Sequence, residues 1–114
     1  MTIENNPSNS GVLSRAQGCL LGQLIGDSLG SLVEFQSPGE ILFNYPEGVR
    51  DMADGGTFNT IAGQPTDDSE MALLLARSLV SQGKFDHEEV RKAYVFWLDS
   101  RPFDVGNAVQ SGLT

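Results

Sequence analysis

Residues 66–81, TDDSEMALLLARSLVS, constrain the fold of this chain more than any other stretch. Beyond Asp68 the segment carries apolar residues on most sides of a helical wheel, and Gly83 provides a stop signal. A helix that is apolar almost all round must lie in the middle of a core. The sequence therefore predicts a central helix from about residue 67 to residue 81.

A second helix is predicted to begin at Ser14, because Ser14 and Gln17 form a capping box ahead of an apolar run. Residues 19–35 carry Gln23, Asp27 and Glu34 and lack charged anchors, which favours a buried helix of a soluble protein over a membrane span. Its glycines recur every fourth residue and share one ridge, at positions 18, 22, 26 and 30. Each costs about 1 kcal/mol of helix stability relative to Ala, so the ridge predicts close packing of another backbone.

The remaining patterns complete an all-α prediction. A helix opens at Asp86, where Glu89 completes a capping box, and stops near Pro102. The last residues predict a turn that leads into a further helix. Residues 36–65 contain three prolines and five glycines and predict a long irregular connection. Because no strand-like alternation occurs, we expect a helical bundle.

Composition fits one domain of 114 residues, and we expect a loose, disordered tail at 1–13 and a single all-α domain at 14–114. The net charge is -8 and the seven basic residues form no stripe, so nucleic acid is not an expected partner. The one cysteine, Cys19, is predicted to be a buried free thiol, which favours a reducing, cytoplasmic setting.

Thr66, Asp67 and Asp68 allow two interpretations. As a helix start, Thr66 would be the N-cap and the two aspartates would be favoured by the helix dipole, at about 0.3 to 1 kcal/mol each. Spacing alone favours this reading. Adjacent aspartates also supply the hard oxygen donors that Mg²⁺ and Mn²⁺ prefer.

Two further carboxylates, both in the segment of the helix predicted from Ser14, are candidate functional residues. Asp27 is costly inside an apolar helix unless it is paired or bound, and a structural hydrogen bond would explain it. Glu34 would lie two turns further along the same face if the helix persisted, and paired carboxylates serve acid and base roles in glycoside cleavage. His87 follows a helix cap and is expected to be a solvated surface residue, which leaves no Ser-His or Cys-His system.

Three motifs together resemble the ADP-ribosylglycohydrolase family, which includes the dinitrogenase reductase-activating glycohydrolases. RAQGCLLGQLIGDSLGSLVEF is similar to the opening helix of the family, TDDSEMALLLARSL to its Thr-Asp-Asp helix start, and RPFDVGNAV to its Asp-x-Gly-Asn segment. Their order and separation agree over residues 14–112.

The resemblance implies the N-terminal portion of an all-α fold that hydrolyses the glycosidic bond between ADP-ribose and a protein side chain or a small molecule. It implies a binuclear Mg²⁺ or Mn²⁺ site, with Thr66, Asp67 and Asp68 as metal ligands. Glu34 would act at the reaction centre, and Asp27 would orient its neighbours. Substrate contacts would come from the Asp-x-Gly-Asn segment, at Asp104, Gly106 and Asn107.

The chain departs from the family pattern in one serious respect. Family members are two to three times as long, and their second metal cluster, Asp-x-Asp-Thr/Ser, has no counterpart here, so half of the metal ligands are missing. We expect the chain alone to be inactive, and its apolar surfaces to cause homo-oligomerisation or association with the missing C-terminal part. The alternative is a non-catalytic structural or ADP-ribose-binding module of the same fold.

Overall fold

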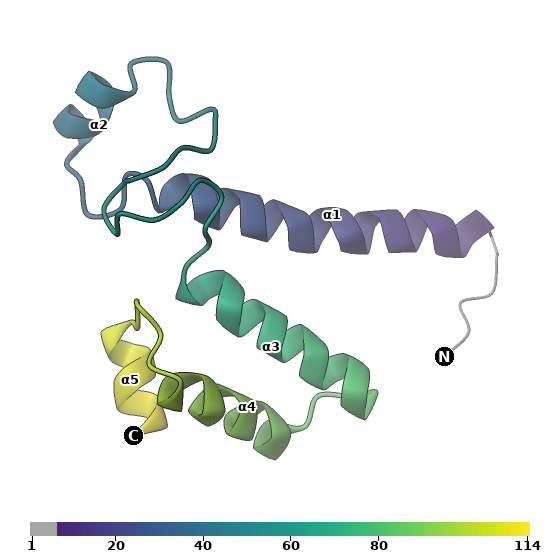
Figure 1. The fold of residues 1–114 in the computed structure, drawn as a ribbon. Helices are drawn as coiled ribbons and strands as arrows, with labels where there is room; N and C mark the ends of the chain where they lie inside the picture. The colour runs from purple at the N-terminus through teal and green to yellow at the C-terminus, as the bar shows by residue number, and fades with distance from the viewer. Residues whose placement is uncertain (1–6) are drawn as a thin grey trace. The chain divides into compact units, whose positions relative to one another are not determined.

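A computed structural model describes residues 7–114 of the chain. It contains five helices in this range, α1 (Pro7–Gly30), α2 (Pro38–Asn44), α3 (Asp67–Gln82), α4 (His87–Asp99) and α5 (Asn107–Leu113) (Figure 1). Residues 7–114 hold no strand, and their only strand-like pairing is an isolated bridge between Gly55 and Thr60. The all-α prediction is confirmed. The chain divides into two compact units, a first unit that ends at Gly63 and a second unit, Gln64–Thr114.

Helix α1 begins seven residues earlier than predicted. It starts at Pro7, a residue that suits the first helical turn because its missing N–H would be unpaired there. The predicted start at Ser14 is therefore wrong, because residues 7–13 are helical, while residues 1–6 lie outside the described part. The helix ends at Gly30 and gives way to turns, so it does not continue to Glu34.

The surface of α1 is more exposed than the sequence predicted. Leu21 and Ile25 are 56% and 50% exposed, and Cys19 is an exposed thiol. The predictions of a buried helix and a buried cysteine are wrong for this structure. A Cβ added at glycine 18, 22, 26 or 30 would meet no atom within 4 Å among the described residues, so the ridge lies bare.

The rest of the first unit folds onto the end of α1. Helix α2 begins with a capping box in which Ser37 and Glu40 bond each other's backbone N–H groups, a short element within the predicted irregular connection. The loop before Gly63 returns to the turns after α1, where Leu32 is buried, with 3% of its surface exposed. Ser28 donates to the carbonyl of Gly63 at 3.0 Å, which fixes the end of the loop.

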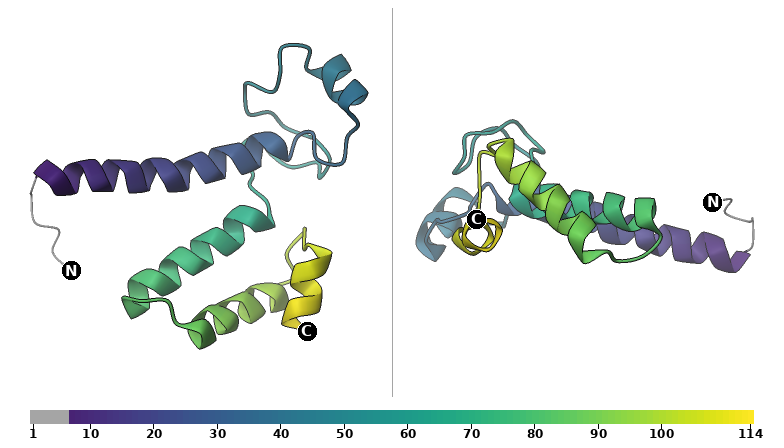
Figure 2. Two further views of the ribbon diagram at one scale, coloured as in Figure 1. Left: turned by 180° about the vertical axis from the view of Figure 1, so that it is seen from behind. Right: turned by 90° about the horizontal axis from the view of Figure 1, so that it is seen from below.

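The second unit is an antiparallel pair of helices, α3 and α4, with α5 packed against α4 (Figures 1 and 2). Helix α3 matches the predicted span and ends at Gly83, whose φ of 69° suits a residue without Cβ. Helix α4 begins where predicted, since Asp86 accepts the N–H of Glu89. Trp97 is 6% exposed and Val90 is 8% exposed, as core residues of α4 should be.

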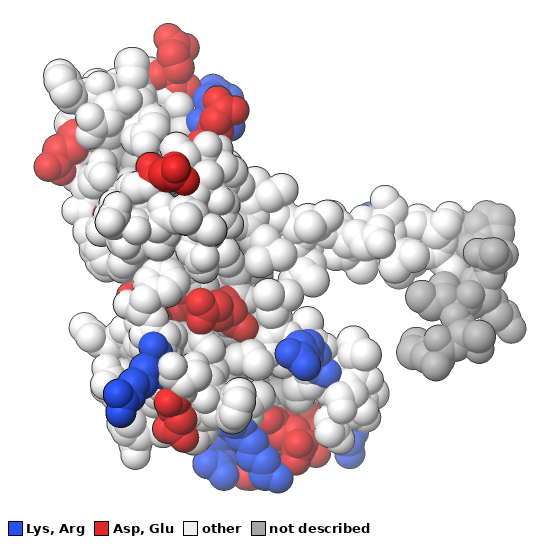
Figure 3. Space-filling model, in the orientation of Figure 1, with Lys and Arg blue, Asp and Glu red and all other residues white. Residues whose placement is uncertain are grey.

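The surface of the described residues carries both basic and acidic side chains. On the face shown in Figure 3, basic side chains alternate with acidic ones and form no continuous basic stripe. His87 has a side chain that is 79% exposed, as predicted. Among residues 7–114, no helix combines the length and hydropathy that crossing a membrane requires.

Candidate functional site

The N-terminus of α3 carries the residues for which capping and metal binding competed. Thr66 occupies the N-cap position, yet its hydroxyl makes no capping hydrogen bond to the helix backbone. Instead the hydroxyl lies 3.5 Å from Oδ2 of Asp68. Thr66 is 1% exposed and Ser69 is fully buried. The two aspartates therefore lie between two buried hydroxyl-bearing residues of the same turn. Thr66 is thus the N-cap by position, as the capping interpretation predicts, but its hydroxyl does not supply the capping hydrogen bond.

Asp67 joins the start of α3 to a segment 39 residues away. The backbone N–H of Gly106 donates to Oδ2 of Asp67 at 3.3 Å. Gly106 is also the N-cap of α5, which begins with Asn107. Two motifs of the sequence, the Thr-Asp-Asp start and the Asp-x-Gly-Asn segment, thus meet at one hydrogen bond.

Asp104 adds a third carboxylate to this meeting point. Its pKa is raised, first by burial, then by the negative charge of Asp67, by a hydrogen bond with the Asp67 side chain and by the charge of Asp68. The N–H of Val105 opposes these effects only in part. Burial and the neighbouring charges of Asp67 and Asp68 thus make the ionised form of Asp104 less favourable than that of an ordinary aspartate.

The chemistry of these donors suits Mg²⁺ or Mn²⁺, which prefer carboxylate and hydroxyl oxygens. The gathering is incomplete, however. Nowhere in residues 7–114 do three histidine, cysteine or acidic side chains come together closely enough to hold a metal ion. The residues present fit part of a site, and each hard cation would need about six donors.

Glu34 lies in the first unit, among the turns that follow α1, and is half-buried. The hydroxyl of Thr57 donates to its backbone carbonyl, which ties Glu34 to the returning loop. Because α1 ends at Gly30, the premise that Asp27 and Glu34 share a helix face is wrong. Asp27 is half-buried, and its carbonyl accepts the N–H of Ser31 at the end of the helix.

One contact near Asp67, Asp68 and Asp104, here called the acidic group, is not predicted by the sequence analysis. The indole N–H of Trp97 donates to Oε2 of Glu70 at 2.6 Å, and so joins the end of α4 to the first turn of α3. The sequence held a signal for it, because a buried indole N–H generally needs an acceptor. The acceptor is Glu70, which lies one turn after Asp67 on α3 and to which the sequence analysis assigns no role.

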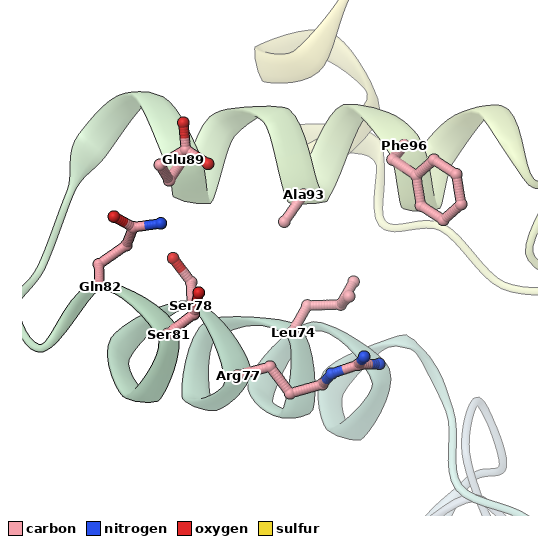
Figure 4. A pocket seen from close by; sticks show the side chains of 8 residues that line it. All are labelled: Leu74, Arg77, Ser78, Ser81, Gln82, Glu89, Ala93 and Phe96. Carbon is pink, nitrogen blue, oxygen red and sulfur yellow. The ribbon is translucent and has the colours of Figure 1, made fainter. Parts of the chain in front are cut away.

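A groove also runs between α3 and α4, with a cavity volume of about 360 Å³ (Figure 4). The side chains that line it are Leu74, Arg77, Ser78, Ser81, Gln82, Glu89, Ala93 and Phe96. None of them belongs to the predicted site. The hydroxyl of Ser78 is buried there without a hydrogen-bond partner.

Comparison with known proteins decides the family. The ADP-ribosylglycohydrolase model matches residues 8–114, nearly the whole chain. The chain belongs to the ADP-ribosylglycohydrolase family. The resemblance read from the three motifs is thereby confirmed.

Relatives within this family show how much of a complete protein the chain represents. It is 45% identical over 103 residues to the ADP-ribosyl-[dinitrogen reductase] glycohydrolase of Rhodospirillum rubrum, which covers 90% of this chain and 34% of that protein. It is 44% identical over 108 residues to an ADP-ribosylarginine hydrolase of Pseudomonas putida, covering 89% of this chain and 28% of that protein. A putative ADP-ribosyl glycohydrolase of Acanthamoeba polyphaga mimivirus is 35% identical, with 93% and 33% covered. The chain thus spans about a third of the length of these curated relatives.

Proposed function

We propose that the chain forms part of a metal-dependent ADP-ribosyl glycohydrolase. Its substrate class is ADP-ribose joined through a glycosidic bond to a protein side chain or a small molecule. The names of two relatives specify dinitrogen reductase and ADP-ribosylarginine. They favour a modified protein side chain as the partner.

The observation that carries this proposal is the meeting of Asp67 with Gly106 and Asp104. A helix start that served only to cap would not need a carboxylate from a second segment, because the dipole is already satisfied by Asp67 and Asp68. Here Asp104 is brought near both, and burial together with their charges raises its pKa. Placing like charges together is unfavourable, and it is common where a cation or a reaction requires it.

Each residue takes a role that its chemistry permits. Thr66, Asp67 and Asp68 would hold the cations, Mg²⁺ or Mn²⁺, which polarise ribose hydroxyls and lower the pKa of bound water. Glu34 would act at the reaction centre. Gly106 and Asn107 would orient the substrate, and Asp104, which keeps a proton more readily than an ordinary aspartate, would donate it to a substrate oxygen.

The remaining metal ligands would come from the part of the family fold that the relatives have and this chain lacks, so we expect hydrolysis to require that part. Association with it, or formation of a homo-oligomer, would cover the exposed apolar surface. Large apolar side chains that are at least half exposed include Val12, Leu21, Ile25, Phe35, Leu42, Phe43, Ile61, Val80, Phe85 and Phe96. A cytoplasmic setting remains part of the proposal.

One observation favours the non-catalytic alternative, an ADP-ribose-binding or structural module. It is the lack of three gathered metal-binding side chains within residues 7–114. A titration with Mn²⁺ separates the two readings, because the module needs no cation.

The experiment compares Mn²⁺ binding by the chain and by a variant with Asp67→Ala and Asp68→Ala. A matched control carries Glu88→Ala and Glu89→Ala, which removes an adjacent acidic pair from the first turn of α4. We expect binding to be lost in the first variant and kept in the second. Equal binding in all three proteins, or none in any, would remove the metal site from the proposal.

A further inference from the structure

The contact between Glu70 and Trp97 lies beside the acidic group, and the proposed function does not use it. Trp97 is 6% exposed, and its indole N–H lies 2.6 Å from Oε2 of Glu70. A hydrogen bond to a carboxylate is about twice as strong as one between neutral groups. The contact is therefore a firm connection between α3 and α4.

Its position makes it more than a general packing contact. Glu70 follows Asp67 by three residues, so both lie on one side of α3, one turn apart. Trp97 lies near the end of α4, and the segment that leaves α4 carries Asp104 and Gly106. The same two pieces of chain are thus joined twice within one helical turn, by Trp97 with Glu70 and by Gly106 with Asp67.

The contact also decides where a fourth carboxylate points. Glu70 belongs to the first turn of α3 together with Asp67 and Asp68. A free Glu70 would compete for the cation or add repulsion, whereas the indole N–H holds its carboxylate against α4. Asp67 and Asp68 are left as the acidic donors that face the Asp104 segment.

We propose that Trp97 and Glu70 are positioning residues, which set the distance between the Thr66–Asp68 start and the Asp104–Gly106 segment and keep Glu70 out of the metal site. The metal part of this statement rests on the proposed function, while the distance part does not. Neither residue touches substrate or metal. Their effect passes through Asp67 and Gly106.

The test uses two readouts, the amide resonance of Gly106 and the affinity for Mn²⁺. Trp97→Phe keeps the ring and removes the N–H, Glu70→Ala removes the acceptor, and Glu70→Gln keeps an acceptor oxygen. Val90→Ala is the matched control, because Val90 is buried in α4 about two turns from Trp97. Asp67→Ala gives the resonance of a Gly106 amide without its partner.

We expect Trp97→Phe and Glu70→Ala to move the Gly106 resonance toward its position in Asp67→Ala and to weaken Mn²⁺ binding about tenfold, the lower end of the effect of losing an outer-shell partner. Glu70→Gln should leave the resonance in place and change affinity by no more than about threefold, the size of a screened charge effect. Val90→Ala should leave the resonance in place.

A Gly106 resonance that Trp97→Phe leaves unmoved, or that Val90→Ala moves equally, would reduce the contact to ordinary packing and overturn the inference. Failure of the original chain to bind Mn²⁺ would count against the proposed function alone. In that case the Gly106 resonance still decides whether the pair positions the segment.

Discussion

Replacing Gly56 by Ala tests how the first unit holds the segment that carries Glu34. Gly56 has φ of 72°, and a Cβ at this position would lie 2.8 Å from Cα of Leu32 and 3.2 Å from its Cδ2. Leu32 is 3% exposed and belongs to the same turns as Glu34. Because the nearest atom is backbone, the conflict cannot be relieved by rotating a side chain.

The expected loss of stability has two parts. A left-handed backbone costs a residue with a Cβ about 1 to 2 kcal/mol, and overpacking a buried contact adds about 1 to 3 kcal/mol. The sum, about 2 to 5 kcal/mol, is a large share of the total stability of a small domain. Each 1 kcal/mol lowers the melting temperature by about 4 to 8 °C in a domain of this size class.

Gly63→Ala is the control that separates the two parts. Gly63 lies in the same unit with φ of 84°, but a Cβ there would meet nothing within 4 Å. Denaturant unfolding should show that Gly56→Ala costs about 1 to 3 kcal/mol more than Gly63→Ala. Equal losses for the two variants would show that Gly56 does not pack against Leu32, and the account of the loop that supports Glu34 would fail.

Two further outcomes can be measured on the second unit. Burial and the charges of Asp67 and Asp68 raise the pKa of Asp104 in the folded chain above its unfolded pKa of about 3.8. The stability that protonated Asp104 contributes is therefore fully present below the unfolded pKa. It is lost as the pH rises through the folded pKa. Without divalent cations, Asp104→Asn should therefore increase the free energy of unfolding at pH 7 by about 0.2 to 1 kcal/mol after solvent screening. It should make no difference at pH 3. A loss of stability at pH 7 would contradict the crowding of carboxylates. Asp86→Ala removes the side chain that accepts the Glu89 N–H at 3.1 Å and should cost about 1 kcal/mol in chemical unfolding, and an unchanged midpoint would show that α4 does not depend on this cap.

The helices of the second unit could be predicted because their signals are local. Asp86 with Glu89, and Gly83 after α3, mark the ends of elements through hydrogen bonds within one turn. The start of α1 was misplaced for a related reason, since the Ser14 and Gln17 pattern fits a capping box and a proline at the first turn is equally acceptable. Local rules do not choose between two acceptable starts.

Burial was predicted less well because it depends on distant neighbours. The apolar character of α1 and α3 suggested interior helices, yet Ile25 is 50% exposed and Val80 is 86% exposed. The glycine ridge of α1 is likewise bare within the described residues. The hydrophobic pattern of a helix shows which face is apolar, and the packing partner of that face is set by residues distant in the sequence.

For the candidate site, too, local patterns could be predicted and contacts between distant segments could not. Spacing alone favoured capping over cation binding for Thr66 to Asp68, and only the motif resemblance connected them with Asp104 and Gly106. The contact between Asp67 and Gly106 spans 39 residues, a separation at which neither periodicity nor propensity carries information. The hydrogen bond between Glu70 and Trp97 spans 27 residues, so no local pattern predicts it either.

We propose the cation site in addition to capping at this helix start for an energetic reason. Capping would stabilise α3 through the Thr66 hydroxyl, but that hydroxyl makes no bond to the helix backbone. Burial, together with the nearby charges of Asp67 and Asp68, raises the pKa of Asp104 and makes its ionised form less favourable. A divalent ion would reverse the sign of that electrostatic term, because it lowers the pKa of the carboxylates around it. If Mn²⁺ does not lower the pKa of Asp104, measured from its carboxyl resonance in the chain, the crowding of these three groups has another cause.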